Sequence, residues 1–146
     1  MAGYVPGGKV VGALPSGRLA GEPLAPAASP STGKDVKGPT AVFKSMGKLD
    51  NVEILAGESL TTRIDPAVFK NKDGVKRLVD LMRTFVDQKI FHVQINVVSS
   101  DTLKAAQKEP EKYRDLTVKV AGYNAFFTQL NKPLQDSIIA RTEHGI

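Results

Sequence analysis

The sequence predicts an α/β domain that follows a long loop segment. The domain prediction rests on an apolar stripe at helical spacing within residues 74–89 and on a β-branched, apolar run at residues 90–98. A chain of 146 residues is long enough for one hydrophobic core and too short for two. The hydrophobic fraction of 41% and the charged fraction of 24% are those of a folded globular protein, so we do not expect disorder throughout the chain.

Residues 1–39 are predicted to be loop, because eight of the 13 glycines and six of the nine prolines lie there. This segment contains no apolar run long enough to span a membrane. It also lacks the basic region followed by a continuous apolar region that a secretory signal requires, so we expect a cytoplasmic protein with no membrane partner. The predicted division is an extended segment at residues 1–39 and a folded domain at residues 40–146.

Three elements are expected in the first half of the folded domain. Pro39 lies where proline is tolerated, just inside a short helix at residues 39–48. Residues 58–69 alternate apolar and polar side chains and contain Asp65-Pro66, which predicts a strand closed by a turn. The helix at residues 74–89 packs against the core through a stripe made of Val75, Leu78, Val79, Met82, Phe85 and Val86.

The run at residues 90–98 predicts a largely buried strand. It is apolar and β-branched, and the polar residues Gln94 and Asn96 alternate with the apolar ones. The side chains of residues 99–101 are suited to cap a short helix at residues 102–109.

The last part of the chain predicts two extended pieces and a helix. A strand is expected at residues 116–120 and a further extended piece at residues 125–130. Asn131 is suited to cap a final helix at residues 132–143, whose inward-facing apolar residues are Leu134, Ile138 and Ile139. We find no internal repeat.

The basic charge predicts a solvated surface rather than a nucleic-acid site. The net charge is +5 and the pI is about 9.5, which would suit phosphate contacts if the basic residues clustered. They are scattered instead, and Asp73 and Asp80 are interleaved with the densest group, which is Lys70, Lys72, Lys76 and Arg77. We expect no nucleic-acid partner.

The usual catalytic and metal-binding patterns are missing. With no cysteine, the chain has no disulfide, no thiolate metal site and no cysteine nucleophile of its own. His92 and His144 are too far apart in sequence to suggest a metal site, and His92 is expected to be a core or rim residue. Glu109 and Glu111 flank Pro110, which ends the preceding helix, and are expected to be exposed.

A glycine interrupts the strand pattern near the end of the chain. In the stretch LTVKVAGYNAFF, residues 116–127, Gly122 stands where a strand would otherwise continue and is followed at once by Tyr123. Glycine at such a place marks a bulge, a tight bend or the close approach of another group.

The residues around Gly122 resemble a known signature. The stretch TVKVAGYNA, residues 117–125, is similar to the glycyl radical signature of the pyruvate formate-lyase family. The resemblance extends over residues 92–146, including the PEKY turn and the RTE ending. Residues 12–50 resemble the segment before the radical domain in the branch that includes glycerol dehydratase. The resemblance implies the C-terminal portion of a pyruvate formate-lyase-type ten-stranded α/β barrel, with residues 1–39 as a Gly/Pro-rich docking segment.

The resemblance also implies a chemical role for Gly122. In the family a radical S-adenosylmethionine activating enzyme removes a hydrogen atom from this glycine, and the stored radical passes to a cysteine that attacks the substrate. A radical on the α-carbon is delocalised over the flanking amide and carbonyl groups, which needs a planar centre that only glycine leaves uncrowded. The radical is formed post-translationally, so no bound cofactor is expected, and the radical state is oxygen-sensitive.

The neighbours of Gly122 have expected roles as well. Val120 and Ala121 supply an apolar approach to the glycine. Tyr123, Phe126 and Phe127 would wedge the loop into a dry interior, and plain core packing is the larger part of their expected role.

The chain departs from the family pattern at three places. Lys119 stands where arginine is usual, and the two differ when a planar, bidentate contact is needed. Ser16 stands where aspartate is usual, and the PAAS stretch at residues 26–29 replaces a more usual Asp-Gly pair. These departures concern the anchoring of the loop and any role in substrate binding.

The missing cysteine shapes the expected function. Family members carry the thiyl cysteine and a catalytic glutamate well before the glycine, and this chain, which begins with its own methionine, has no cysteine. We therefore expect the radical-bearing small subunit of a split lyase or dehydratase, inactive without a large partner subunit. The alternatives are a repair protein that restores an oxygen-cleaved enzyme and a basic binding module unrelated to radicals. The sequence leaves the substrate open.

Overall fold

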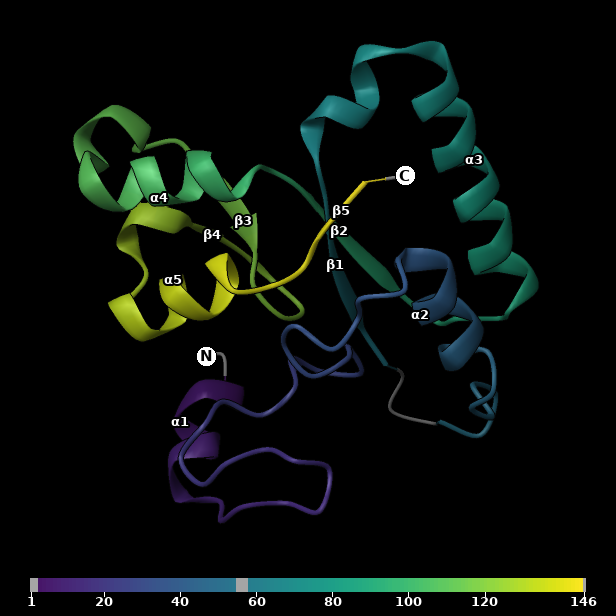
Figure 1. Cartoon of the computed structure of the whole chain (residues 1–146), viewed down its shortest axis with the longest axis horizontal. Coiled ribbons are helices and arrows are strands. Elements are labelled where there is room, and N and C mark those ends of the chain that lie inside the picture. Colours follow the sequence, from purple (N-terminus) through teal and green to yellow (C-terminus); the bar gives the residue numbers. More distant parts are fainter. Residues whose placement is uncertain (1–2, 55–57, 146) are drawn as a thin grey trace.

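The computed structural model describes residues 3–54 and 58–145 (Figure 1). The chain contains both helices and strands, and a helix connects two parallel strands, which confirms the predicted α/β class. Within the described residues no helix has the length and apolar character needed to cross a membrane. The elements in chain order are α1 (Tyr4–Val10), α2 (Pro39–Met46), β1 (Leu60–Ile64), η1 (Pro66–Lys70), α3 (Lys72–Asp87), β2 (Val93–Val97), α4 (Ser100–Lys108), η2 (Pro110–Tyr113), β3 (Thr117–Lys119), β4 (Asn124–Phe126), η3 (Phe127–Gln129), α5 (Lys132–Ile139) and β5 (Glu143–His144).

A parallel sheet crosses the middle of the molecule in the order β2-β1-β5 (Figure 1). Strands β1 and β2 pair from Leu60 opposite Val93 to Ile64 opposite Val97, and α3 connects them as the crossover helix. The predicted strands at residues 58–69 and 90–98 are thereby confirmed in position. The turn after β1 is the short helix η1, where Asp65 accepts a hydrogen bond from the Ala67 amide.

Two hydrophobic clusters lie on opposite sides of this sheet, and Figure 1 shows the helices of each. One cluster lies beneath α2 and α3, with Phe43 and Leu60 fully buried. The other lies among α1, α4, α5 and the β3-β4 hairpin, with Leu103, Val120 and Phe127 fully buried. The hairpin therefore belongs to the second cluster and lies beside β2, the strand at the sheet edge.

The apolar stripe predicted for α3 is only partly correct. Leu78, Met82 and Phe85 pack on the core, and the Phe85 ring meets Phe43 edge-on at a centroid distance of 6.2 Å. The other three predicted residues are exposed, and the buried residue at the centre of the face is Leu81. The buried face runs through Leu78, Leu81, Met82 and Phe85, so Val75, Val79 and Val86 point to solvent.

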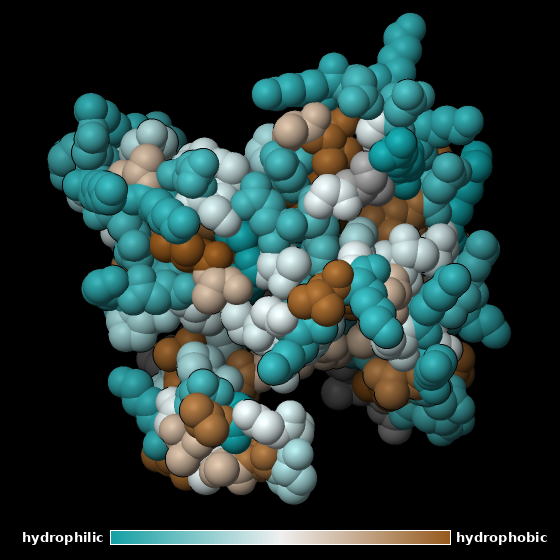
Figure 2. All heavy atoms as spheres, viewed as in Figure 1, coloured by the Kyte–Doolittle hydropathy of each residue, from teal (hydrophilic) through white to brown (hydrophobic). Residues whose placement is uncertain are grey.

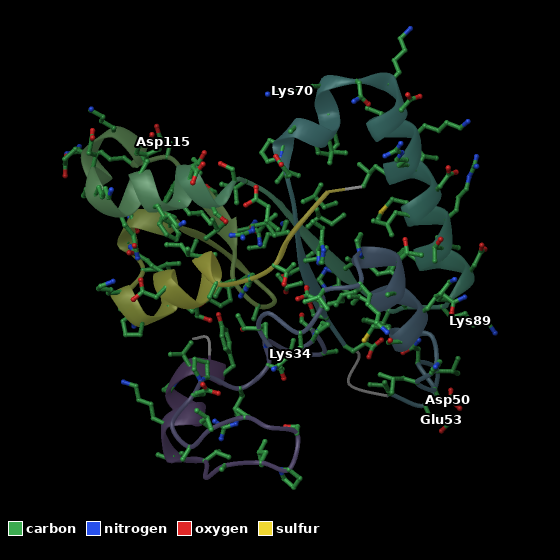
Figure 3. The ribbon with its side chains drawn as sticks, in the orientation of Figure 1. Lys34, Asp50, Glu53, Lys70, Lys89 and Asp115 are labelled. Carbon is green, nitrogen blue, oxygen red and sulfur yellow. The ribbon has the colours of Figure 1, made fainter. Side chains whose placement is uncertain are left out.

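The charged residues near α3 are exposed and spread out. Figure 2 shows hydrophilic side chains over the outer surfaces of α3 and α4, and Figure 3 places Lys70 and Lys89 near opposite ends of α3. Lys72, Asp73 and Asp80 are exposed on the same helix. Basic and acidic side chains are thus mixed on this surface, as predicted for a solvated helix face.

The final helix is shorter than predicted. Asn131 caps α5 by accepting a hydrogen bond from the Leu134 amide, as expected, but the helix ends at Ile139. Glu143 and His144 then pair with Arg63 and Ile64 as the parallel strand β5. Pairing with a distant strand overrides the local helical pattern here, which a reading of neighbouring residues does not capture.

The segment at residues 1–39 is not all loop. Tyr4–Val10 form α1, and Tyr4 and Val5 are buried in the second cluster, so the loop prediction is wrong for these residues. The rest of the segment, over residues 11–38, contains no helix or strand but is held by side chains. The Arg18 guanidinium donates to four backbone carbonyls, those of Val11, Gly12, Leu19 and Glu22. Residues 1 and 2 lie outside the described part, and the division at residue 39 stays a prediction.

Candidate functional site

Gly122 lies at the tip of the β3-β4 hairpin. The strands pair from Thr117 opposite Phe126 to Lys119 opposite Asn124, and the Val120 amide donates to the Tyr123 carbonyl at 2.9 Å. At the second position inside this turn, Gly122 has φ +85°, where residues with a side chain are strained. Of the three explanations for this glycine, the structure selects a tight bend.

The space around the glycine is open within this chain. A Cβ built on Gly122 meets no heavy atom of the described residues within 4 Å, and the residue is exposed. The requirement for glycine therefore comes from the backbone dihedral and not from crowding by the chain itself. A group from outside this sequence has access to the Cα.

The tip of the hairpin and the end of β3 next to it are held by two polar side chains of β2. Gln94 Oε1 accepts a hydrogen bond from the Gly122 amide at 3.0 Å. Asn96 contacts both backbone groups of Lys119, accepting from its amide at 2.7 Å and donating to its carbonyl at 2.9 Å. Gln94 and Asn96 are 6% and 5% exposed, so their polar groups depend on these partners.

Arg141 also binds this stretch of backbone. Its guanidinium donates to the Lys119 carbonyl at 3.1 Å and to the Val120 carbonyl at 2.6 Å. It also donates to the Tyr4 hydroxyl at 3.0 Å, which joins α1 to the hairpin. Arg141 is buried, and its planar guanidinium connects residue 141, α1 and the Gly122 loop in one hydrogen-bond network.

A second buried guanidinium holds the segment that carries Arg141. Arg63, on β1, donates to the Arg141 carbonyl, to the Ile139 carbonyl at 3.2 Å and to Ser100 Oγ at 2.9 Å. Burial lowers the pKa of Arg63 below its usual value, and the nearby Glu143 carboxylate, 3.7 Å away, opposes that shift. The Arg141 charge acts with burial to lower the pKa of Arg63.

The predicted neighbours of Gly122 divide into buried and exposed groups. Val120 and Phe127 are fully buried and Ala121 is half-buried, as expected for a packed approach to the loop. Tyr123 is 36% exposed and Phe126 is 43% exposed, so the expectation that they wedge into an interior is wrong within this chain. Both lie on the accessible side of the hairpin.

The Lys119 side chain does not anchor the loop. Its Nζ donates to Asn124 Oδ1 across the hairpin at 3.0 Å, in an exposed position. The anchoring contacts, from Asn96 and Arg141, are made to the Lys119 backbone, which is the same in lysine and arginine. Within this chain, the departure from the family's arginine leaves those contacts unchanged.

The remaining candidate residues lie apart from the hairpin tip. His92 is exposed at the start of β2, while His144 is buried and lies 2.9 Å from Asp35 Oδ2. Among residues 3–54 and 58–145, no group of three acidic or histidine side chains is placed to hold a metal ion. Glu109 and Glu111 are exposed and form surface ion pairs with Lys112 and Arg114.

The N-terminal departures from the family also lie elsewhere. Ser16 is exposed and lines an open cavity of about 650 Å³ between the N-terminal segment and α5. Ser29, in the PAAS stretch, is buried and its Oγ accepts a hydrogen bond from the Thr61 amide at 2.8 Å. Ser29 therefore binds the N-terminal segment to β1.

Sequence reasoning missed the residues that hold the loop. Gln94 and Asn96 were recognisable as polar positions in an apolar strand, but the sequence does not say that both face the hairpin. Arg141 lies 22 residues from Lys119 and 137 from Tyr4, so no local pattern connects them. Gln94, Asn96 and Arg141 share one property: each is a buried polar side chain that binds backbone groups of the Gly122 loop.

Known proteins match this chain over a range that includes the Gly122 hairpin. A family model described as "Glycine radical" matches residues 24–128, a range that includes the β3-β4 hairpin. The chain is 50% identical over 141 residues to the probable dehydratase YbiW of Escherichia coli and 48% identical over 143 residues to the isethionate sulfite-lyase of Oleidesulfovibrio alaskensis. These matches cover 96% and 97% of this chain but only 17% of each relative.

Solved structures agree with the sequence matches. The glycerol-bound form of the B12-independent glycerol dehydratase from Clostridium butyricum aligns with a TM-score of 0.93 and 48% identity, over 98% of this chain and 18% of that one. A glycyl radical enzyme from Archaeoglobus fulgidus aligns with a TM-score of 0.92 and 41% identity, over 99% of this chain and 19% of that one. The chain therefore has the fold of one region of much longer proteins.

Proposed function

The chain belongs to the glycyl radical family, and from this premise we propose that it stores an organic radical on Gly122 and passes it to a cysteine outside this sequence. The observation that carries the proposal is the placement of the glycine. Gly122 is exposed at a hairpin tip, its Cα is open to outside groups, and buried side chains hold its amide and the loop base. The matched family range includes this residue.

The proposed chemistry uses one C–H bond. An activating enzyme of the radical S-adenosylmethionine class takes a hydrogen atom from the Gly122 Cα, which leaves one unpaired electron there. The Cα radical then takes a hydrogen atom from the thiol of the partner's cysteine, which restores glycine and leaves a thiyl radical to attack the substrate. This chain supplies the storage site, and its part in the step is to position the Cα and to hold the loop.

The cysteine that receives the radical must come from outside this sequence. The chain has no cysteine and spans 17% of the length of the relatives named above. We propose that a large partner subunit supplies the cysteine and the catalytic glutamate, in an enzyme of the lyase or dehydratase type. The choice of substrate would then rest mainly on residues of that partner.

The second candidate function is repair of an enzyme cleaved by oxygen. One observation favours the split enzyme over repair. The N-terminal segment packs on the rest of the domain, because Tyr4 binds Arg141, which holds the hairpin, and Asp35 binds His144 on β5. A repair protein requires only the radical loop and the strands nearest to it, whereas this chain adds a segment of more than thirty residues that packs on them.

Electron paramagnetic resonance tests the radical itself. After anaerobic activation, we expect a carbon-centred doublet split by the one hydrogen that remains on the Gly122 Cα. Growth on α-deuterated glycine should collapse the doublet, and exposure to air should cut the backbone at Gly122, between Ala121 and Tyr123. A doublet that survives deuteration, or a cut at another residue, would contradict the assignment to Gly122.

Copurification tests the partner. A tagged form of this protein, expressed in its native host under anaerobic conditions, should retain a large chain that carries a cysteine and a glutamate of the family's active site. If the retained protein is instead a complete glycyl radical enzyme that has been cleaved at its own glycine, the repair function is supported and the split-subunit proposal fails. Recovery of a single longer polypeptide that contains this sequence would also overturn the split arrangement.

A further inference from the structure

We infer that Gln94 is a positioning residue for the Gly122 radical, acting through the hydrogen bond that its side-chain oxygen accepts from the Gly122 amide. The inference rests on the proposed function and extends it to a residue that does not react. The N–O distance is 3.0 Å, and the acceptor side chain is 6% exposed. No other hydrogen bond in the described residues joins a side chain to the backbone of Gly122.

The strand that carries Gln94 makes this contact rigid. Gln94 lies opposite Thr61 in the β1-β2 pairing, as the second of five consecutive paired positions. Two residues further along β2, Asn96 fixes Lys119, the last paired residue of β3 before the turn, with two hydrogen bonds. One strand thus holds the hairpin at the end of β3 and at its tip, and the tip contact is made directly to the residue that bears the radical.

The hydrogen bond matters because the amide nitrogen shares the unpaired electron. Loss of a hydrogen atom makes the Gly122 Cα planar, and delocalisation then requires the flanking amide and carbonyl to lie in the same plane. An acceptor on the N–H makes the nitrogen more electron-rich, which strengthens its donation to the radical centre. The contact from Gln94 therefore stabilises the radical more than it stabilises the unreacted glycine.

The contact also determines which side of the glycine moves. With φ at +85°, the unreacted Gly122 is far from the planar arrangement that the radical prefers. The amide of Gly122 is bound to Gln94, and on the carbonyl side the Tyr123 carbonyl accepts a hydrogen bond from the Val120 amide at 2.9 Å. With the amide kept in place by Gln94, flattening requires the Tyr123 side of the tip to rotate and the Val120–Tyr123 hydrogen bond to adjust.

The test compares two buried or half-buried glutamines of the same domain. Gln94→Met removes the acceptor at nearly constant length, and Gln94→Glu keeps an acceptor oxygen at the same position. Gln135→Met is the matched control, because Gln135 donates to the Phe127 carbonyl at 2.9 Å and does not contact Gly122. Each variant is activated anaerobically with the partner and the activating enzyme, and spins per chain are counted.

We expect Gln94→Met to lower the number of spins per chain roughly fivefold, the factor that corresponds to one ordinary hydrogen bond. The hyperfine coupling of the Gly122 amide proton, read from spectra in H₂O and D₂O, should fall, and the splitting by the Cα hydrogen should rise. Gln94→Glu should restore both values, and Gln135→Met should leave them unchanged. The couplings are read per spin, so they do not depend on how much of a variant folds.

The outcomes separate this inference from the function on which it rests. A wild-type protein that gives no doublet overturns the storage of a radical on Gly122. A wild-type doublet with unchanged couplings in Gln94→Met overturns only the role of Gln94. Changed couplings in Gln135→Met as well would overturn that role too, since the effect would then report general loosening of the domain.

Discussion

Gly122→Ala is expected to abolish the radical signal and the oxygen-dependent cleavage completely. The alanine Cα carries one hydrogen and a methyl group, so abstraction would have to produce a crowded tertiary centre on a loop that φ +85° already strains. The substitution should lower the free energy of unfolding by about 1–2 kcal/mol, the cost of a side chain in the left-handed region. The added Cβ meets no neighbour within 4 Å in the described chain, so no clash adds to this cost. Electron paramagnetic resonance and urea unfolding measure the two effects.

Gly17→Ala is the matched control for backbone strain. Gly17 has φ +90° and also offers open space to a Cβ among the described residues, but it lies in the N-terminal segment away from the hairpin. It should lose a similar amount of stability and keep the doublet. A doublet retained in Gly122→Ala would show that the radical resides elsewhere and that the glycine serves only the bend.

Arg141→Met is expected to lower the free energy of unfolding by about 2–3 kcal/mol. The substitution keeps most of the side-chain length but leaves the carbonyls of Lys119 and Val120 without the guanidinium, and Val120 is fully buried. A buried acceptor that loses its donor costs about 1–3 kcal/mol. Arg141→Lys should recover only part of the loss, because an ammonium lacks the planar fork that reaches several acceptors at once. Urea unfolding followed by circular dichroism measures each value.

Arg83→Met provides the comparison for Arg141. Arg83 is exposed on α3 and pairs with Asp80 at 3.2 Å, a surface ion pair whose loss should change stability by about 0.5 kcal/mol or less. Equal effects of the two substitutions would mean that the Arg141 network does not hold the hairpin in solution.

The parts of the fold that depend on neighbouring residues were predictable from the sequence. The crossover helix α3, the strands β1 and β2, and the caps at Ser99 and Asn131 all follow from spacing and local hydrogen-bonding chemistry. Gly122 was recognisable as an interruption of a strand, and its resemblance to a radical signature gave it a chemical meaning. The dihedral that makes it a tight bend became clear only from the structure.

The parts that failed depend on distant residues. Helix α5 was predicted too long because β1, some 80 residues earlier in the chain, recruits Glu143 and His144 into the sheet. The predicted stripe on α3 included Val75 and Val86, since a 3.6-residue period alone does not say on which side the core lies. The side chains that hold the Gly122 loop were also not predictable, because Gln94 and Arg141 are distant from it in sequence and contact it only in the folded chain.

The long reach of the Tyr4–Arg141 contact has a consequence for folding kinetics. A hairpin such as β3-β4 closes within about 1–10 μs from local contacts. The bond between Tyr4 and Arg141 spans 137 residues and the one between Asp35 and His144 spans 109, so both require closure of very large loops. The hairpin therefore forms early, and the contacts made by Tyr4 and Asp35 form late. Contacts that form after the transition state affect mainly the unfolding rate. Removing the Tyr4–Arg141 hydrogen bond should therefore speed unfolding and leave the refolding rate nearly unchanged.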